Sequence, residues 1–169
     1  MKVEIIPIKN LQLSKTCFYT VKIEGRPCSE FKDFAIRMVS SNSDNKKEFG
    51  EISMYLKKLG NEMGAIKECF KREREADRLV LPYHVEVDIE DDKNFGLRLY
   101  CYWFSEKLVF LFNGDRKTNI KAELCENVRL HFLQAIALSR ALDLAFGLKK
   151  LQVDDEGLYY NDDNFNLEI

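Results

Sequence analysis

The chain has 169 residues, of which 46% are hydrophobic, 12% aromatic and 32% charged. This length fits one globular domain with a sizeable core, and the aromatic content excludes collagen-like, low-complexity and wholly disordered chains. The net charge is −2, yet residues 152–169 hold six acidic and no basic side chains, so residues 1–151 carry 26 basic against 22 acidic ones, a charge of +4. Such a body is compatible with a nucleic-acid partner.

The sequence has no pattern that indicates a membrane span, a secretory signal or a metal site. No apolar run approaches the roughly 18 residues of a spanning helix, and the first ten residues contain charges and no cleavage site. The five cysteines are odd in number and lack metal-site spacing. We therefore expect a cytoplasmic protein with reduced thiols, no metal and no cofactor.

The first sixty residues predict two strands followed by two helices. Residues 1–8 and 16–24 are predicted strands. In the second segment apolar side chains recur at every second residue, which is the period of a strand. Ser29 is the candidate N-cap of a first helix. A second helix follows over residues 46–59, with Gly60 as its C-terminal stop.

The middle of the chain is rich in predicted strands. Residues 65–77 predict a short charged helix or an irregular arm packed on the sheet. A strand is predicted over residues 79–88, interrupted by a proline and followed by a turn. Residues 96–104 and 108–114, joined by a tight turn, predict a β-hairpin.

A long helix and an acidic, aromatic tail complete the predicted order. The helix, over residues 127–147, is apolar on more than one stripe, so it is either deeply packed or contacts a partner. Strands and helices are segregated along the chain, which predicts an α+β fold with a largely antiparallel sheet. We expect a single domain over residues 1–151, with residues 152–169 as a tail.

Basic and aromatic side chains gather around the predicted hairpin. The candidate site residues are Arg98, Tyr100, Tyr102, Arg116, Lys117 and Lys121. Those on one strand face and those at the end of the neighbouring strand can converge on one concave surface that holds a phosphodiester. Guanidinium forks match phosphate oxygens, and a tyrosine ring can stack on an unpaired base. Alternatively, Arg98 is an ordinary arginine on a sheet surface.

Residues 96–118 resemble the core of the RelE/ParE toxin superfamily, including its RelE and HigB branches. The resemblance rests on a strand with glycine, a hydrophobic residue and Arg98, a hairpin, and a second strand that ends in a small residue before a basic pair. The upstream order of a strand and two helices also fits, and the resemblance spans roughly residues 17–121. It implies a sheet with two helices packed on one face.

The resemblance implies an mRNA interferase, a toxin that cleaves the message on the ribosome and is held by a cognate antitoxin. In this chemistry the nucleotide's own 2′-hydroxyl attacks the adjacent phosphate without a metal, and basic side chains stabilise the transition state. Arg98 matches the phosphate clamp, and Arg116 or Lys117 matches the residue that stabilises charge or protonates the leaving group. Strand face and proximity, and not the family motif, indicate that Tyr100 or Tyr102 would stack on a base and that Lys121 would bind substrate.

Two features depart from this family, and two alternatives stay open. Residues 118–124 lack the tyrosine found in RelE-branch enzymes, and the whole chain is acidic. One alternative is a non-catalytic relative that binds nucleic acid, a ribosome, gyrase or a protein partner, and the other is an unrelated α+β domain. The tail, residues 152–169, is either a partial RNA mimic that lies over the basic groove, a disordered terminus or an added edge segment.

Overall fold

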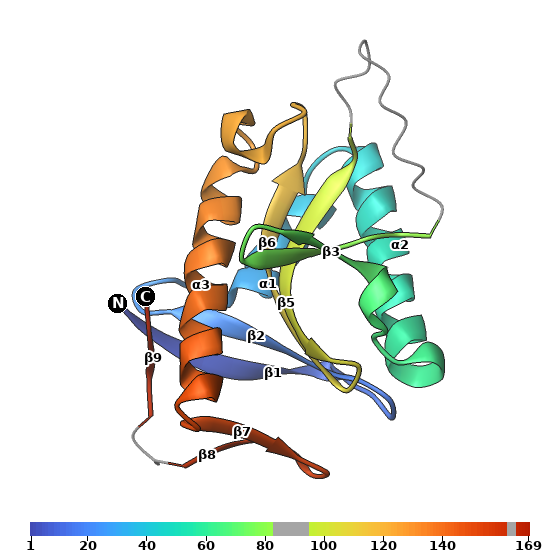
Figure 1. The fold of residues 1–169 in the computed structure, drawn as a ribbon. Helices are drawn as coiled ribbons and strands as arrows, with labels where there is room; N and C mark the ends of the chain where they lie inside the picture. Colours follow the sequence, from blue (N-terminus) through green and yellow to red (C-terminus); the bar gives the residue numbers. More distant parts are fainter. Residues whose placement is uncertain (83–94, 162–164) are drawn as a thin grey trace.

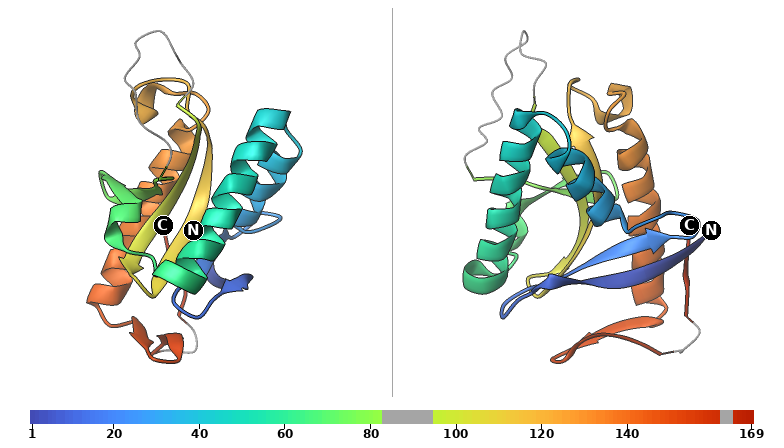
Figure 2. Two further views of the ribbon diagram at one scale, coloured as in Figure 1. Left: turned by 90° about the vertical axis from the view of Figure 1, so that its right-hand side faces the viewer. Right: turned by 180° about the vertical axis from the view of Figure 1, so that it is seen from behind.

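The structure, a computed structural model, describes residues 1–82, 95–161 and 165–169. These residues form three layers, and the middle layer is a seven-stranded sheet of order β3-β4-β5-β6-β2-β1-β9. Helices α1 (Glu30–Val39) and α2 (Ser43–Lys58) cover one face, and α3 (Arg129–Gly147) covers the other (Figures 1 and 2).

The strands of the sheet and the shorter elements have the following bounds. The sheet contains β1 (Lys2–Gln12), β2 (Cys17–Ile23), β3 (Phe70–Glu73), β4 (Ala76–Leu79), β5 (Leu97–Ser105), β6 (Leu108–Arg116) and β9 (Leu167–Glu168). A separate hairpin consists of β7 (Leu151–Asp154) and β8 (Gly157–Tyr160). Short helical segments are η1 (Leu59–Met63), η2 (Lys67–Cys69) and η3 (Ala122–Leu124).

The sheet is mixed, because β2 and β6 run parallel while the other paired strands are antiparallel. Parallel neighbours need a long connection, and here it consists of both helices and the three strands β3 to β5. The α+β class is confirmed. The sheet is largely antiparallel as expected, but it is not antiparallel throughout, because β2 and β6 form a parallel pair that strand patterns in the sequence do not reveal.

Side chains alternate between two hydrophobic cores, one on each face of the sheet. Towards α3, the ring of Tyr100 packs 5.3 Å from that of Phe132. Towards α1 and α2, Phe34 packs edge-on against Phe49, 5.7 Å between ring centroids. Three of the five cysteines are buried in these cores and two are half-buried, all as free thiols.

The predicted hairpin, the paired N-terminal strands and the three main helices are confirmed, with shifts of a few residues at their ends. Ser29 occupies the predicted N-cap position, although its side chain makes no capping bond. The predicted strand over residues 79–88 matches β4 only at Leu79, and its residues 83–88 and the turn after it lie outside the described residues.

Gly60 does not end the second helix. The helical path continues through η1 to Gly64, whose φ of 77° is the conformation that favours glycine at a helix end. Gly60 instead provides room for Leu13, because a Cβ at position 60 would lie 2.3 Å from the Cδ1 atom of Leu13. The glycine serves a close contact between η1 and the β1–β2 turn.

The charged segment over residues 65–77 forms η2 and the β3–β4 hairpin rather than a charged helix or arm. Its turn places Arg74 at a φ of 57°. In β4 the charged side chains Asp77 and Arg78 are buried and ion-paired, with Arg72 and Glu73 respectively. Because these charged side chains are buried through ion pairs, the polar sequence of β4 does not indicate a buried strand.

The acidic tail is ordered where the structure describes it. Its first part continues from α3 into the β7–β8 hairpin, and its last residues pair with β1 as β9. The hairpin lies near the β5–β6 turn, where Lys107 Nζ is 3.9 Å from Asp155 Oδ1. This is the opposite end of β6 from Arg116, so the described tail does not lie over the predicted basic groove.

None of the helices in the described part of the chain is long and apolar enough to cross a membrane.

Candidate functional site

The predicted site residues on β5 and β6 lie on opposite faces of the sheet. Arg98 pairs across the strands with Asp115, and Leu97 pairs with Arg116. Directly paired residues project from the same face, and successive residues project from opposite faces. Arg98 therefore faces the α3 side and Arg116 faces α2. The predicted convergence of these two arginines in one pocket is wrong.

Arg98 lies in the interior, with only 6% of its surface exposed. Its Nη1 atom is 4.0 Å from Glu73 Oε1, and the same oxygen accepts a 2.6 Å hydrogen bond from Arg78 Nε. Two buried guanidinium groups thus share one carboxylate. In this conformation Arg98 is a packed, ion-paired residue and presents no open phosphate clamp.

Tyr100 and Tyr102 share the face of Arg98 and are covered by α3. Tyr100 is fully buried against Phe132, and burial raises the pKa of its phenol well above the ordinary value. Tyr102 donates a 2.7 Å hydrogen bond to Asp143 Oδ1 of α3, and burial together with this carboxylate raises its pKa as well. Neither ring is available to stack on a base.

The basic residues at the end of β6 have separate surroundings. Arg116 donates to Asn45 Oδ1 at 2.7 Å and to Glu48 Oε1 at 2.6 Å, both on α2. Lys117 is buried, with its Nζ 5.4 Å from the centre of the Phe95 ring. Lys121 is exposed. These three side chains do not form a common cationic surface.

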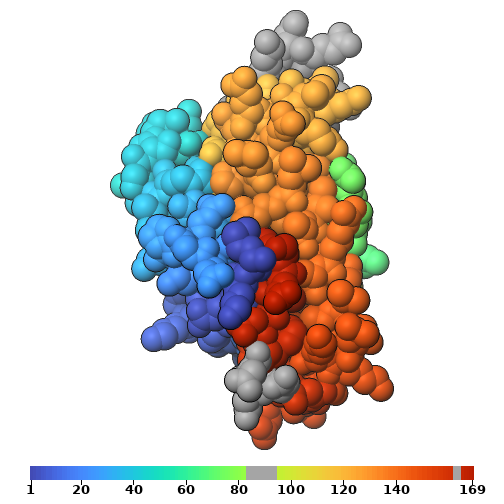
Figure 3. Space-filling model, turned by 90° about the vertical axis from the view of Figure 1, so that its left-hand side faces the viewer, coloured from blue at the N-terminus to red at the C-terminus, as the bar shows by residue number. Residues whose placement is uncertain are grey.

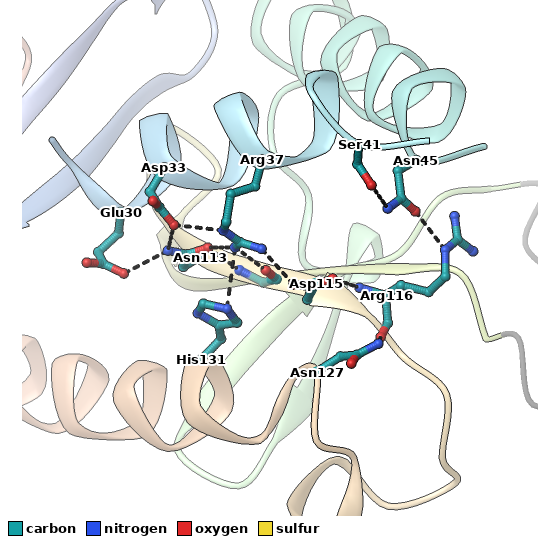
Figure 4. Close-up of polar contacts among 11 residues, drawn as sticks. Glu30, Asp33, Arg37, Ser41, Asn45, Asn113, Asp115, Arg116, Asn127 and His131 are labelled. Carbon is teal, nitrogen blue, oxygen red and sulfur yellow. Dashed lines mark hydrogen bonds and ion pairs between the residues drawn. The ribbon is translucent and has the colours of Figure 1, made fainter. Parts of the chain in front are cut away.

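A different set of polar side chains meets at the carboxyl end of β6, and we call it the β6-end network. It consists of Glu30, Asp33, Arg37, Asn113, Asp115 and His131 (Figure 4). The pairing of β2 with β6 ends at Tyr19 and Phe110. The chain then leaves β2 into α1 on one face and leaves β6 towards α3 on the other. In open sheets this divergence of parallel strands leaves a crevice at their carboxyl ends.

Arg37 is the centre of the β6-end network. Its Nε donates to Asp33 at 2.9 Å and its Nη1 to Asp115 at 2.6 Å. Its Nη2 donates to Asn113 Oδ1 and to the carbonyl of Gly114, and lies 3.4 Å from His131 Nε2. One guanidinium therefore joins α1, β6 and α3.

The charges in the network fix the ionisation of its titratable groups. Burial raises the pKa of Asp33, but hydrogen bonds from Asn113 and Arg37 and the charge of Arg37 outweigh it and hold this pKa below its usual value. Burial and the Arg37 charge lower the pKa of His131, although Asp115 and Asp33 partly oppose them. His131 is therefore neutral at pH 7, and Asp33 is ionised.

The β6-end network can clamp elements together, because all three guanidinium nitrogens of Arg37 are engaged by protein atoms. Among the described residues, no three histidine, cysteine or acidic side chains are grouped closely enough to hold a metal ion. The sequence holds one local signal for the network, the spacing of Asp33 and Arg37 by one helical turn. Their distant partners Asn113 and His131 have no such signal.

A second feature lies on the outward face of α3, and we call it the α3 outer stripe. It consists of Leu130, Leu133, Ala137, Ala141, Leu144 and Leu148. Steps of three and four residues place them along one side of the helix, opposite its buried side. Leu130 is 73% exposed and Leu144 is 63% exposed. Figure 3 shows this face, with α3 in orange beside the red C-terminal segment.

The α3 outer stripe continues into a hollow of about 430 Å³ between α3 and β9. Leu144 and Leu148 line it from the helix, and Phe165 from the C-terminal segment. Exposed cations border the stripe and its C-terminal end: Arg129, Lys149 and Lys150, together with Arg140, which is ion-paired with Glu75. Glu168 is the acidic residue that lines the hollow. The exposed Glu126 and Asp143 are the acidic residues nearby on the same segment.

Comparison with known proteins gives no relative. No protein-family model, no curated protein and no solved structure matches the chain. The fold and these two features define an α+β protein with both sheet faces covered and one helix that is apolar on its outer as well as its inner side.

Proposed function

We propose that this protein is a protein-binding module that holds a partner on the α3 outer stripe. One observation carries the proposal: four leucines of the stripe, Leu130, Leu133, Leu144 and Leu148, are exposed at the helical period along the solvent side of α3. The half-buried Ala137 and Ala141 lie between them. A surface helix of a globular protein usually has one apolar stripe, and a contiguous exposed apolar patch marks an interaction site. The outer stripe is thus the surface most suited to contact another protein.

The chemistry around the stripe favours an acidic amphipathic helix as the partner. Apolar side chains of such a helix would pack on the stripe and enter the hollow beside β9. Its acidic flanks would face Arg129, Lys149 and Lys150. A second copy of the chain fits less well, because an antiparallel pair of α3 helices would bring Arg129 of one copy towards Lys149 and Lys150 of the other.

A protein-binding function is compatible with the resemblance to the RelE/ParE superfamily, which includes the alternative of a non-catalytic binding protein. The order of β2, two helices and the meander β4–β5–β6 follows the order that the resemblance implies. The buried state of Arg98 and Tyr100 and the pairing of Arg116 with Glu48 favour the non-catalytic alternative within that superfamily. We therefore propose a binding function for this protein in preference to a catalytic one.

A peptide titration tests the proposed function. The probe is a labelled 18-residue helix with leucines at every third and fourth position and glutamates on the flanks, measured by fluorescence anisotropy. We expect saturable binding that Leu144→Glu and Leu148→Glu each weaken about tenfold or more, since each loses the burial of a leucine and adds a charge.

Two controls accompany this titration. A peptide with lysines in place of the glutamates should bind at least about fivefold more weakly, given the cations at the border. Met54→Glu changes an apolar side chain on α2 that is 74% exposed and away from α3, and it should leave binding unchanged. Equal binding by both peptides, or insensitivity to the α3 variants, would contradict the proposal.

The mRNA interferase remains a second candidate function, and the resemblance of the β5–β6 hairpin with its basic end favours it. The test is inducible expression of the wild type beside Arg116→Ala and Lys117→Ala, with message cleavage mapped on and off ribosomes. An interferase would arrest growth and cleave message, and these substitutions would abolish both effects. Circular dichroism of each purified variant separates loss of chemistry from loss of folding.

A further inference from the structure

A groove runs between β1 and the helix pair α1–α2. Figure 2 (right) shows these elements, with the helix pair on the face of the sheet away from α3. Ile6 and Ile8 of β1 form one wall, and Phe31, Phe49 and Leu56 of the helices form the other. Its volume is about 500 Å³. This lies within the roughly 300–1,000 Å³ range of small-molecule sites, which are mostly apolar with a few placed polar groups.

The charged side chains that line the groove are both cations. They are Lys32 and Lys57, and the other lining residues are uncharged. Two of the lining hydroxyls are already used, because Thr20 Oγ1 accepts from the amide of Phe31 and Ser53 Oγ donates to the carbonyl of Phe49. The groove therefore offers an apolar surface with positive charge, and its remaining polar side chains are those of Asn10 and Ser29.

Each helix of the pair contributes one of the two lysines. Lys32 is in the first turn of α1 and Lys57 is in the last turn of α2. Only a short connection separates these helices, and Phe49 of α2 contacts both Phe31 and Phe34 of α1. A ligand in the groove would thus meet apolar side chains and one ammonium group from each helix.

An added β-strand is a poorer occupant than a small molecule. The outer edge of β1 beyond Val3 has no neighbouring strand among the described residues, since β9 pairs only with Lys2 and Val3. However, Pro7 in this edge has no N–H to donate, and the exposed Lys9 follows it. Proline and lysine are residues by which natural edge strands resist strand addition.

We propose that this groove binds an anionic amphiphile with a single acyl chain, such as a medium-chain fatty carboxylate. The chain lies against Ile6, Ile8 and Phe49, and the carboxylate pairs with an ammonium group of the lining lysines, Lys32 or Lys57. This site is separate from the α3 outer stripe and does not depend on the proposed partner.

Calorimetric titration of the full chain with sodium octanoate and decanoate, below their micelle concentrations, tests the apolar part of the proposal. Saturable 1:1 binding is expected. Each added methylene should tighten binding about fourfold, since its burial is worth about 0.8 kcal/mol. Ala35→Phe places a ring in the groove, and it should abolish binding.

The charged part is tested with a double variant, Lys32→Glu with Lys57→Glu. Both lysines are exposed, so the protein should fold normally, and decanoate should bind about fivefold or more weakly. Decanol, which has the same chain and no charge, should bind the double variant and the wild type alike. Lys47→Glu reverses an exposed charge of α2 outside the groove and is the matched control.

Three results would overturn the proposal. They are the absence of saturable binding, equal affinity of the wild type and the double variant for decanoate, and binding of an acidic extended peptide to β1 in place of decanoate. Amide chemical shifts of Ile6 and Ile8 would distinguish the last result. Because none of these readouts involves α3, their failure leaves the proposed protein-binding function untouched.

Discussion

Gly114 sits at the closest approach of the two central strands. It pairs with Leu99 of β5, and a Cβ atom at position 114 would lie 1.7 Å from the carbonyl oxygen of Arg98. The neighbouring register is irregular between Leu99 and Cys101. A glycine is needed here because any side chain would collide with backbone, which cannot rotate away as a flexible side chain can.

Gly114→Ala should therefore lower the free energy of unfolding by about 3 kcal/mol, since the strands must separate to admit the methyl group. Gly50→Ala is the matched control. Gly50 lies within α2 with no atom within 4 Å of its would-be Cβ, so alanine should stabilise the protein by about 1 kcal/mol. Urea unfolding measures both, and similar effects of the two substitutions would refute this role of Gly114.

At the scale of the element, α3 is held on the sheet by contacts of different kinds. Phe132 packs on Tyr100, Asp143 accepts from Tyr102, and His131 contacts Arg37 of α1. The last contact brings a titratable group beside a permanent positive charge. The attachment of the N-terminal part of α3 should consequently depend on pH.

His131 should make the protein less stable as the pH falls. Its pKa in the folded chain is lowered by burial and by Arg37, so between the ordinary value of about 6.5 and the folded value the unfolded chain binds a proton that the folded chain does not. The contribution is complete above about pH 6.5 and is lost as the pH falls through the folded pKa.

Urea unfolding of the wild type and His131→Gln between pH 7.5 and 5 measures this contribution. The wild type should lose more stability across this range than the variant, and His84→Gln controls for the other histidine. The lowered pKa of Asp33 acts in a more acidic range, below about 3.9, and does not interfere. Parallel pH profiles of the wild type and His131→Gln would contradict this assignment.

At the scale of the whole molecule, the two ends of the chain close one edge of the sheet. The nitrogen of Met1 donates to the carbonyl of Ile169, and the amide of Ile169 donates to Met1. Leu167 pairs with Val3 and is buried in the core beneath α3. The C-terminal residues thus belong to the folded unit together with β1.

Leu167→Ala should destabilise the protein by about 2–4 kcal/mol through loss of a buried side chain. Glu168→Ala, at the exposed neighbouring position, should change stability by no more than about 0.5 kcal/mol. Thermal or urea unfolding of the two variants measures the difference. An equal, small effect of both would show that the C-terminal segment does not contribute to the core.

Much of the fold could be predicted from local patterns. The alternation of β2, the periodicity of α1 and α2 and the turn of the β5–β6 hairpin each reflect neighbours within a few residues. The β3–β4 hairpin could not be predicted from local patterns, because its buried charged side chains are stabilised by ion pairs within the fold. The tail could not either, because β9 exists only through its pairing with β1.

The candidate site depended even more on tertiary structure. The sequence correctly located basic and aromatic residues around one hairpin, but strand register decided that Arg98 and Arg116 face opposite sides. The cover of α3 decided that Tyr100 is buried. Arg37 and His131, 94 residues apart, are joined only because β2 and β6 are parallel and diverge.

The amino-acid sequence by itself determined the α+β class, the main helices and strands, and the presence of an apolar surplus on the last helix. These properties follow from periodicity and side-chain type, which act over one turn or one strand. Only the tertiary structure decided which stripe of α3 is buried, which charges are paired and which surface stays open. Those outcomes depend on contacts between residues that are distant in sequence, and local sequence patterns do not indicate such contacts.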